Sequence, residues 1–173
     1  MRETADQDGR YAEAVEAFGP ALQRLARATE ANPERRRDLL QDMHVALWRS
    51  FAHFDQRCSV RTWVYRVAHN VAASHVDRER RGNRALIPLD DVTDIPDTSS
   101  FGADLETGDM LARLHAVIRA LGPPDRQIIA LYLEELDAAA IAEITGLSSG
   151  AVATRISRFK SRLARLFQEN ADV

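Results

Sequence analysis

A run of prolines and acidic residues divides this chain and limits the folds open to it. Residues 86–108 read LIPLDDVTDIPDTSSFGADLETG, with two prolines, two glycines and six acidic side chains but no basic one. Proline lacks the backbone donor that a helix needs and clashes with the preceding turn, so no regular helix crosses this run. We therefore predict an acidic flexible linker at 86–108 between two small domains, one at 10–85 and one at 109–170.

Apolar residues on both sides of the linker recur every three or four positions, which is the spacing of amphipathic helices. Leu39, Leu40, Met43 and Leu47 follow it within residues 37–51. No segment alternates apolar and polar residues in the manner of a strand. The predicted fold class is all-α, with two small helical domains. The expected helices span residues 11–29, 37–51, 60–80, 105–121, 125–134, 136–144 and 149–168.

The composition excludes several classes of protein. With 45% hydrophobic and 28% charged residues, the chain has the make-up of a globular protein. It contains no apolar run near the roughly 18 residues of a membrane-spanning helix, and its polar, acidic N-terminus is unlike a signal peptide. The single cysteine, Cys58, cannot form an internal disulfide. We expect a cytoplasmic protein that does not insert into membranes.

Positive charge gathers near the C-terminus of a chain whose net charge is −3. There, a short helix, a turn with Gly146 and a longer helix follow the layout of a helix-turn-helix. Positions 145–167 hold five basic residues and no acidic one. At about 100° per residue, the apolar stripe of the longer helix opposes a face of small polar residues and arginines.

This polar face suits the major groove of DNA, because its centre meets base edges and its shoulders meet phosphates. We predict that Arg158, with Thr154 and Ser157, reads bases, and that Arg155 and Lys160 bind phosphates. The full predicted set is Thr154, Arg155, Ser157, Arg158, Lys160 and Arg162.

Two motifs make the functional prediction more specific. The stretch DLLQDMHVALWRSFAHFD at 38–55, followed by RTWVYRVAHN at 61–70, resembles region 2 of bacterial sigma factors. Residues 123–163 resemble region 4 of the same family, although Ala140, Ala151 and Ala153 depart from its usual pattern. With these two regions and a short linker, the chain is similar to the extracytoplasmic-function (ECF) sigma factors of the sigma-70 family.

The resemblance implies a transcription initiation factor that binds core RNA polymerase, recognises the −35 and −10 promoter elements and assists promoter melting. It implies contacts with the β′ clamp coiled coil and the β flap of the polymerase, and regulation by an anti-sigma factor. The residues at the polymerase-binding positions are Asp38, Gln41, Asp42 and Trp48. The residues at the −10 positions are Phe54, Asp55, Arg61, Arg66, Asn70 and Arg78.

General chemistry agrees with these implied roles. An aromatic surface with hydrogen-bonding side chains offsets part of the cost of unstacking a base, as expected of Phe54, Asp55 and Asn70. The arginines suit phosphate contacts, which give salt-dependent affinity. We expect Trp63 to pack in the core. The linker has two open interpretations: it occupies a basic path in the polymerase, or its acids merely keep it extended.

Two other classes of function remain as alternatives. A stand-alone helix-turn-helix regulator would account for residues 123–168 but would leave 38–70 without a role. An enzyme would need ligands or nucleophiles among His44, His53, His69, His75 and Cys58. His69 and His75 are six residues apart and would project to different faces of a helix. We identify no cysteine or acidic residue paired with them at metal-ligand spacing, so we expect neither catalysis nor a cofactor.

Overall fold

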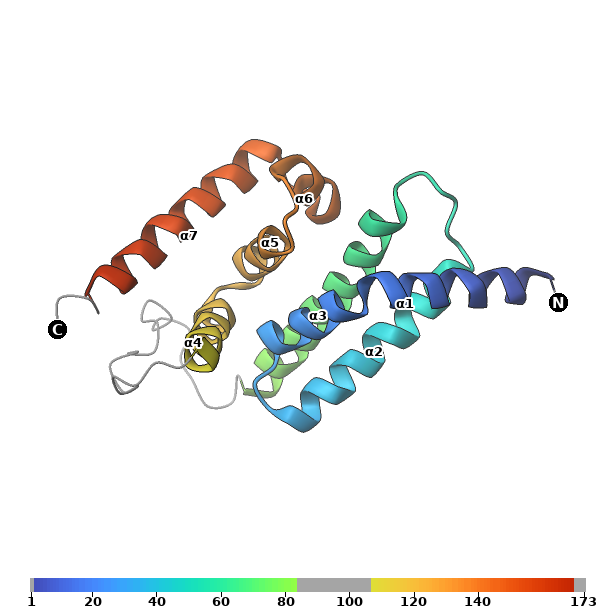
Figure 1. Ribbon diagram of the computed structural model, residues 1–173, viewed down its shortest axis with the longest axis horizontal. Helices are drawn as coiled ribbons and strands as arrows, with labels where there is room; N and C mark the ends of the chain where they lie inside the picture. The colour runs from blue at the N-terminus through green and yellow to red at the C-terminus, as the bar shows by residue number, and fades with distance from the viewer. Residues whose placement is uncertain (1, 84–106, 170–173) are drawn as a thin grey trace.

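The computed structural model describes residues 2–83 and 107–169. Within these ranges it forms seven helices and no strand. The helices are α1 (Arg2–Thr29), α2 (Pro33–Phe51), α3 (Val60–Asn83), α4 (Thr107–Ala120), α5 (Pro123–Leu133), α6 (Ala138–Thr145) and α7 (Ser149–Glu169). Figure 1 shows α1–α3 grouped on the side of the N-terminus and α4–α7 on the other side. The all-α prediction is confirmed. The predicted linker lies outside the described residues, except that Thr107 and Gly108 begin α4.

The first helix begins nine residues earlier than its apolar pattern predicts, at Arg2 in place of position 11. Its added turns make polar contacts with α2. Gln7 donates to the backbone carbonyl of Trp48 at 2.8 Å, and Trp48 Nε1 donates to Asp8 at 2.8 Å. Apolar periodicity cannot detect a helix end that is held by hydrogen bonds, so the predicted start was wrong.

Local capping groups explain where the other helices begin and end. Asn32 accepts hydrogen bonds from the backbone N–H groups of Glu34 and Arg35 and caps α2, whose first residue is proline. Asp137 caps α6 in the same manner. Gly146 ends α6 in the left-handed conformation at φ 75°, which favours glycine because it has no Cβ. The Ser148 hydroxyl then accepts from the Ala151 N–H at the start of α7.

Helices α1–α3 enclose one apolar cluster. Leu22 of α1, Met43 of α2 and Val64 of α3 are each at most 1% exposed. Complete burial of a side chain of this size contributes about 1.5–3 kcal/mol. Ala130 of α5 also belongs to this cluster, so the N-terminal core extends to the C-terminal half.

Helices α4–α7 enclose a second cluster, in which Ile128, Ile141 and Val152 are completely buried. Tyr65 of α3 and Ala21 of α1 are members of it. Helix α1 therefore packs on α4, and α3 packs on α5 and α6. The two halves share an apolar interface, which we call the interdomain interface.

Glu134, one residue past α5, is the main polar contact across the interdomain interface. Its carboxylate accepts two hydrogen bonds from Arg24, both 2.6 Å long, and one from the Tyr65 hydroxyl at 3.3 Å. The bond to Glu134 raises the pKa of Arg24, even though burial opposes the charge. Burial raises the pKa of Tyr65, and the neighbouring Glu134 adds to this effect. A second polar contact across the interdomain interface joins α4 to α1, where Arg119 donates to the backbone carbonyl of Arg27 at 3.0 Å.

No helix within residues 2–83 and 107–169 combines the length and the hydropathy of a membrane span. Long helices do occur, but charged residues interrupt them on every turn or two.

His69 is buried on α3 where α5 covers it. It is 3% exposed, and Leu25 and Ala130 line the same small cavity. Burial lowers the pKa of His69 to about 3, because the charged imidazole would lose its hydration.

Lowering the pH from 7 to 5 is expected to reduce the free energy of unfolding by about 2 kcal/mol through His69. The native imidazole stays neutral at pH 5, because its pKa is about 3. In the unfolded chain it titrates near 6.5 and takes up a proton, so stability falls as the pH falls. Urea denaturation at both pH values, compared with His69→Gln, measures this contribution. The same pH dependence in both proteins would contradict it.

Candidate DNA and polymerase interface

Helix α7 presents two distinct faces, as its sequence predicts. Val152, Ile156 and Phe159 are at most 8% exposed and pack into the second cluster. On the rest of the helix, the predicted DNA-binding residues Thr154, Ser157, Arg158, Lys160 and Arg162 are exposed. The hydrophobic stripe thus fixes α7 on α5 and α6 and turns its basic side outward.

The two predicted phosphate-binding residues already have partners in the same domain. Arg155 is half-buried and forms an ion pair with Asp125 in the first turn of α5. The Lys160 ammonium lies 4.8 Å from the centroid of the Tyr132 ring, within the range of a cation–π contact. These partners position both cations at the sides of α7. Neither pairing could be predicted from the spacing within α7, because Asp125 and Tyr132 lie on α5.

A groove of about 510 Å³ runs beside this basic side of α7. The groove is lined on the α7 side by Thr154, Arg155, Arg158 and Arg162, and Asp125 of α5 also lines it. The groove therefore collects four of the six residues that the sequence assigns to the −35 contact.

The loop between α2 and α3 holds two predicted −10 residues in different environments. Phe54 is half-buried, with ring centroids 5.9 Å from Phe51 and 5.2 Å from Trp63. Asp55 is exposed and accepts from the Arg57 side chain at 2.9 Å. Trp63 packs against the core, as expected, and donates to the Ser50 hydroxyl at 2.9 Å.

Asn70 does not join this loop in the structure. It is exposed on α3, seven residues or about 10 Å of helix beyond Trp63. None of the hydrogen bonds among the described residues connects Asn70 to Phe54 or Asp55. The three residues predicted to capture a base are therefore not brought together: Phe54 and Asp55 lie on the loop, and Asn70 lies on α3.

The interdomain interface engages two of the predicted −10 arginines. Arg61 donates to the backbone carbonyl of Glu134 at 3.0 Å, and its guanidinium lies 5.9 Å from the Tyr65 ring centroid. Arg66 donates to the backbone carbonyl of Glu143 in α6 at 2.9 Å. Both guanidinium groups therefore contact the C-terminal half in this arrangement, although the Arg61 side chain is exposed and that of Arg66 is half-buried.

The predicted polymerase-binding residues lie on the outer side of α2. Asp38, Gln41 and Asp42 are exposed, and Trp48 is 37% exposed. Arg78 of α3, a predicted −10 residue, lies 3.5 Å from Asp42. The two sets of residues therefore meet at the α2–α3 boundary.

Val45 is a further contact candidate, which the sequence did not predict. It is 41% exposed although apolar, and it follows Asp38, Gln41 and Asp42 at the helical spacing of one face. That spacing was visible in the sequence, but Val45 was indistinguishable there from a core residue.

Comparison with known proteins identifies both halves. Residues 14–82 match the family Sigma-70 region 2, and residues 111–163 match the family Sigma-70, region 4. The ECF RNA polymerase sigma factor SigM of Mycobacterium tuberculosis is 31% identical over 146 residues, which cover 84% of this chain and 70% of SigM.

Two solved structures share the fold. One is CnrH in complex with the cytosolic domain of CnrY, at 24% identity and a TM-score of 0.68, covering 97% of this chain and 94% of CnrH. The other is the sigma factor RpoE in complex with the anti-sigma factor NepR from Bartonella quintana, at 20% identity and a TM-score of 0.69, covering 91% of this chain and 96% of RpoE. With both regions matched in order and the identity to SigM, this chain belongs to the ECF RNA polymerase sigma factors, which are alternative sigma factors of transcription initiation.

Proposed function

We propose that this sigma factor reads the −35 element with α7 and the −10 element with the loop after α2 and the exposed side of α3. The observation that carries the proposal is the face of α7: a buried apolar stripe fixes the helix, and the polar residues opposite are exposed. A helix held in this manner presents side chains to a major groove without rearranging. Region 2 occupies 10–85 and region 4 occupies 109–170 in this proposal, and these bounds contain the matched ranges.

The outer side of α2 carries the residues that we propose to contact core polymerase. We assign the β′ clamp coiled coil to Asp38, Gln41, Asp42 and Trp48, and the β flap to region 4. Exposed carboxylates on one helix suit a partner helix that carries arginines. Val45 would add apolar contact area at the centre of the same face.

Run-off transcription tests this function. The purified chain with core polymerase is expected to start transcription at selected promoters in a genomic promoter pool. Initiation no better than with core polymerase alone would refute the proposal. A stand-alone regulator would instead bind a promoter fragment without core polymerase, as a gel mobility shift would show. That function would leave region 2 without a role.

An anti-sigma factor is the regulatory partner that we propose. CnrH was solved with the cytosolic domain of CnrY, and RpoE with the anti-sigma factor NepR. Their shared fold with this chain supports a comparable partner here. We also propose that the chain acts in the cytoplasm, where promoter DNA is, and has no catalytic activity of its own.

Arg158→Ala is expected to relax base selection at one position of the −35 element. An exposed arginine that forms two bonds to guanine contributes about 1–3 kcal/mol of discrimination. Lys160→Ala removes a phosphate contact instead, so it should weaken binding to all sequences and reduce the salt slope by about one. Fluorescence anisotropy with matched and scrambled −35 duplexes distinguishes the two effects. Equal losses of affinity on both duplexes for Arg158→Ala would overturn this division of roles.

A further inference from the structure

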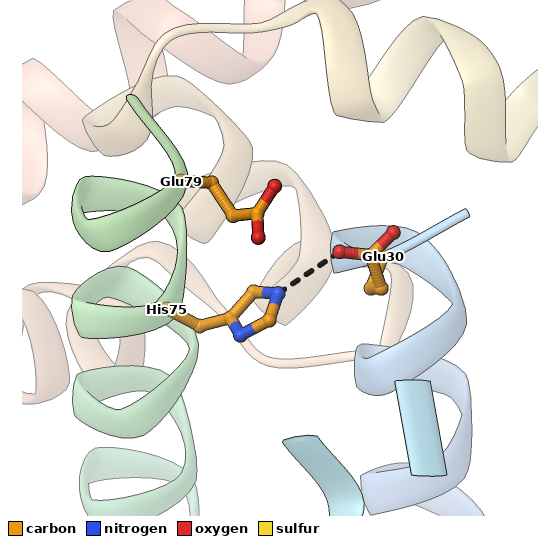
Figure 2. A group of neighbouring side chains, drawn as sticks. All are labelled: Glu30, His75 and Glu79. Carbon is orange, nitrogen blue, oxygen red and sulfur yellow. Dashed lines mark hydrogen bonds and ion pairs between the residues drawn. The ribbon is translucent and has the colours of Figure 1, made fainter. Parts of the chain in front are cut away.

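Three side chains capable of binding a metal ion converge where the end of α1 meets α3. Glu30 follows α1, and His75 and Glu79 lie one turn apart on α3. One ligand atom from each lies within 4.8 Å of the others. Figure 2 shows the three side chains pointing toward one another across the gap between the helices. We call this group the Glu30–His75–Glu79 cluster.

Two of the three side chains in the cluster are largely buried and contact each other. The side chains of Glu30 and His75 are 12% and 13% exposed, and His75 Nε2 lies 3.0 Å from a Glu30 oxygen. The other oxygen of Glu30 accepts from the Asn32 backbone N–H at 2.8 Å. Burial raises the pKa of Glu30, but the hydrogen bonds from His75 and Asn32 outweigh it, so the pKa lies below its ordinary value. The contacts with His75 and Asn32 hold the Glu30 carboxylate in place.

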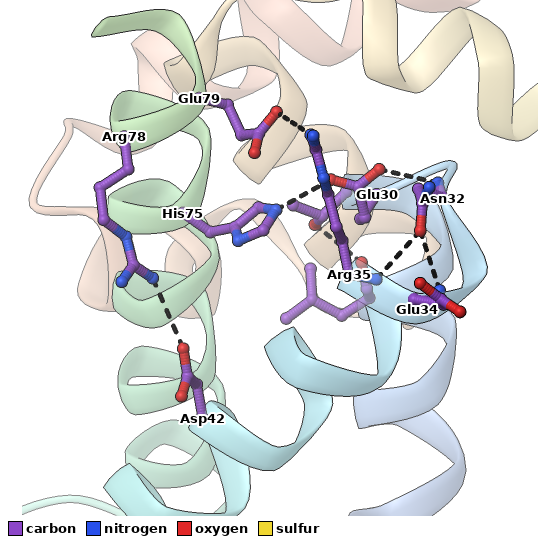
Figure 3. Close-up of polar contacts among 10 residues, drawn as sticks. Glu30, Asn32, Glu34, Arg35, Asp42, His75, Arg78 and Glu79 are labelled. Atoms are coloured by element: carbon purple, nitrogen blue, oxygen red, sulfur yellow. Dashed lines mark hydrogen bonds and ion pairs between the residues drawn. The ribbon is translucent and has the colours of Figure 1, made fainter. Parts of the chain in front are cut away.

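Arg35 provides the positive charge that faces Glu79. Its guanidinium donates to Glu79 at 2.7 Å, as Figure 3 shows, and the Glu79 side chain is 39% exposed. An exposed pair of this kind contributes little stability, about 0–1 kcal/mol. A divalent cation would therefore displace Arg35 from Glu79 at small cost, while Asn32 continues to hold Glu30.

We propose that Glu30, His75 and Glu79 bind a divalent transition-metal ion of the zinc type. One imidazole nitrogen and two carboxylate oxygens are a ligand set that zinc accepts, with water in the fourth position. Ligands of a tetrahedral zinc ion lie about 3.3 Å apart, given bonds of about 2.0–2.1 Å. The three ligand atoms lie within 4.8 Å of one another, so side-chain rotations would bring them to this spacing when an ion binds. The bound ion would join the end of α1 to α3.

Spacing along the sequence indicates only part of this site: Glu79 lies four residues after His75, but Glu30 lies 45 residues before it. No metal was expected, because the prediction found no cysteine or acidic residue at metal-ligand spacing from His69 or His75 and so overlooked Glu79. Helix packing supplies the third ligand.

Titration calorimetry with Zn²⁺ on metal-free full-length protein tests the proposal, with Co²⁺ absorption as a second readout. The wild type is expected to bind one ion, and His75→Gln, Glu79→Gln and Glu30→Gln each to lower affinity by about tenfold or more. Arg35→Ala removes the competing cation, so it should raise affinity. Zn²⁺ should also raise the melting temperature of the wild type and leave that of His75→Gln unchanged.

Two surface variants serve as controls. His53→Gln and Asp77→Asn replace an exposed imidazole and an exposed carboxylate outside the cluster, and both should bind Zn²⁺ as the wild type does. Circular dichroism verifies that each variant is folded. Absence of stoichiometric binding to the wild type would overturn the proposal, as would equal binding by His75→Gln. Unchanged or weaker binding by Arg35→Ala would refute the role of Arg35 as the displaced cation.

Discussion

Glu134→Lys is expected to separate the two halves of the chain and shift the equilibrium toward an open form by about ten- to hundredfold. The side chain of Glu134 is 12% exposed and accepts two hydrogen bonds from Arg24 and one from Tyr65. Hydrogen bonds to a charged group contribute about 1.5–3 kcal/mol. A lysine at this position loses these bonds and places a positive charge against Arg24. The apolar part of the interdomain interface then has to hold the two halves alone.

Energy transfer between dyes on Cys58 and on a cysteine introduced at exposed Ser161 measures this separation. Glu135→Lys makes the same charge change at the next residue, which is exposed, and should leave the transfer efficiency unchanged. Arg24→Glu combined with Glu134→Lys restores opposite charges and should recover the closed form. If Glu134→Lys and Glu135→Lys give the same efficiency, the carboxylate of Glu134 does not hold the halves together.

The same variant tests how the closed form affects DNA binding. Arg61 and Arg66 donate to backbone carbonyls of the C-terminal half, and we expect these hydrogen bonds to compete with DNA contacts while the halves are packed. Opening releases both guanidinium groups. Glu134→Lys should therefore bind single-stranded −10 DNA more tightly than the wild type. Weaker binding would mean that these arginines do not contact the −10 element.

Local sequence determined most of the fold. The apolar spacing of α2 predicts the buried side of Leu39, Met43 and Leu47, because a helix repeats its faces every 3.6 residues. Asn32-Pro33 and Gly146 mark helix ends for equally local reasons, a side-chain cap and a left-handed backbone. Apolar spacing failed to predict only the first turns of α1, where polar contacts with α2 replace apolar burial.

The candidate site was less predictable, because its contacts join distant parts of the chain. The exposed face of α7 follows from periodicity alone. The partners of Arg155, Arg61 and Arg66 do not, since they lie 30, 73 and 77 residues away. A helix face can be read from one segment, but an ion pair between helices depends on how the segments pack. For the same reason, the sequence suggested free phosphate-binding arginines where the structure shows engaged ones.

Ile141→Ala is expected to lower the free energy of unfolding by about 2–5 kcal/mol. Ile141 is completely buried on α6, in the cluster that also holds Val152 of α7. The smaller side chain loses its transfer free energy and leaves a cavity beneath the helix-turn-helix. Met110→Ala is the matched control, because Met110 is 48% exposed on α4 and its loss should change stability by about 0.5 kcal/mol or less. Urea denaturation followed by circular dichroism measures both.

The affinity of Ile141→Ala for −35 DNA distinguishes residues that support α7 from residues that contact DNA. Ile141 cannot touch DNA while it is buried, so its loss acts on binding only through the fraction of folded protein and the position of α7. At low temperature most of the variant remains folded. There, the loss of binding free energy for the −35 duplex should be far smaller than the loss of free energy of unfolding. Arg158→Ala should show the opposite pattern, with full stability and altered base selection, because the Arg158 side chain is exposed on α7. If Ile141→Ala removes −35 binding while its circular dichroism stays native, the orientation of α7 on α6 sets affinity more strongly than its side chains do.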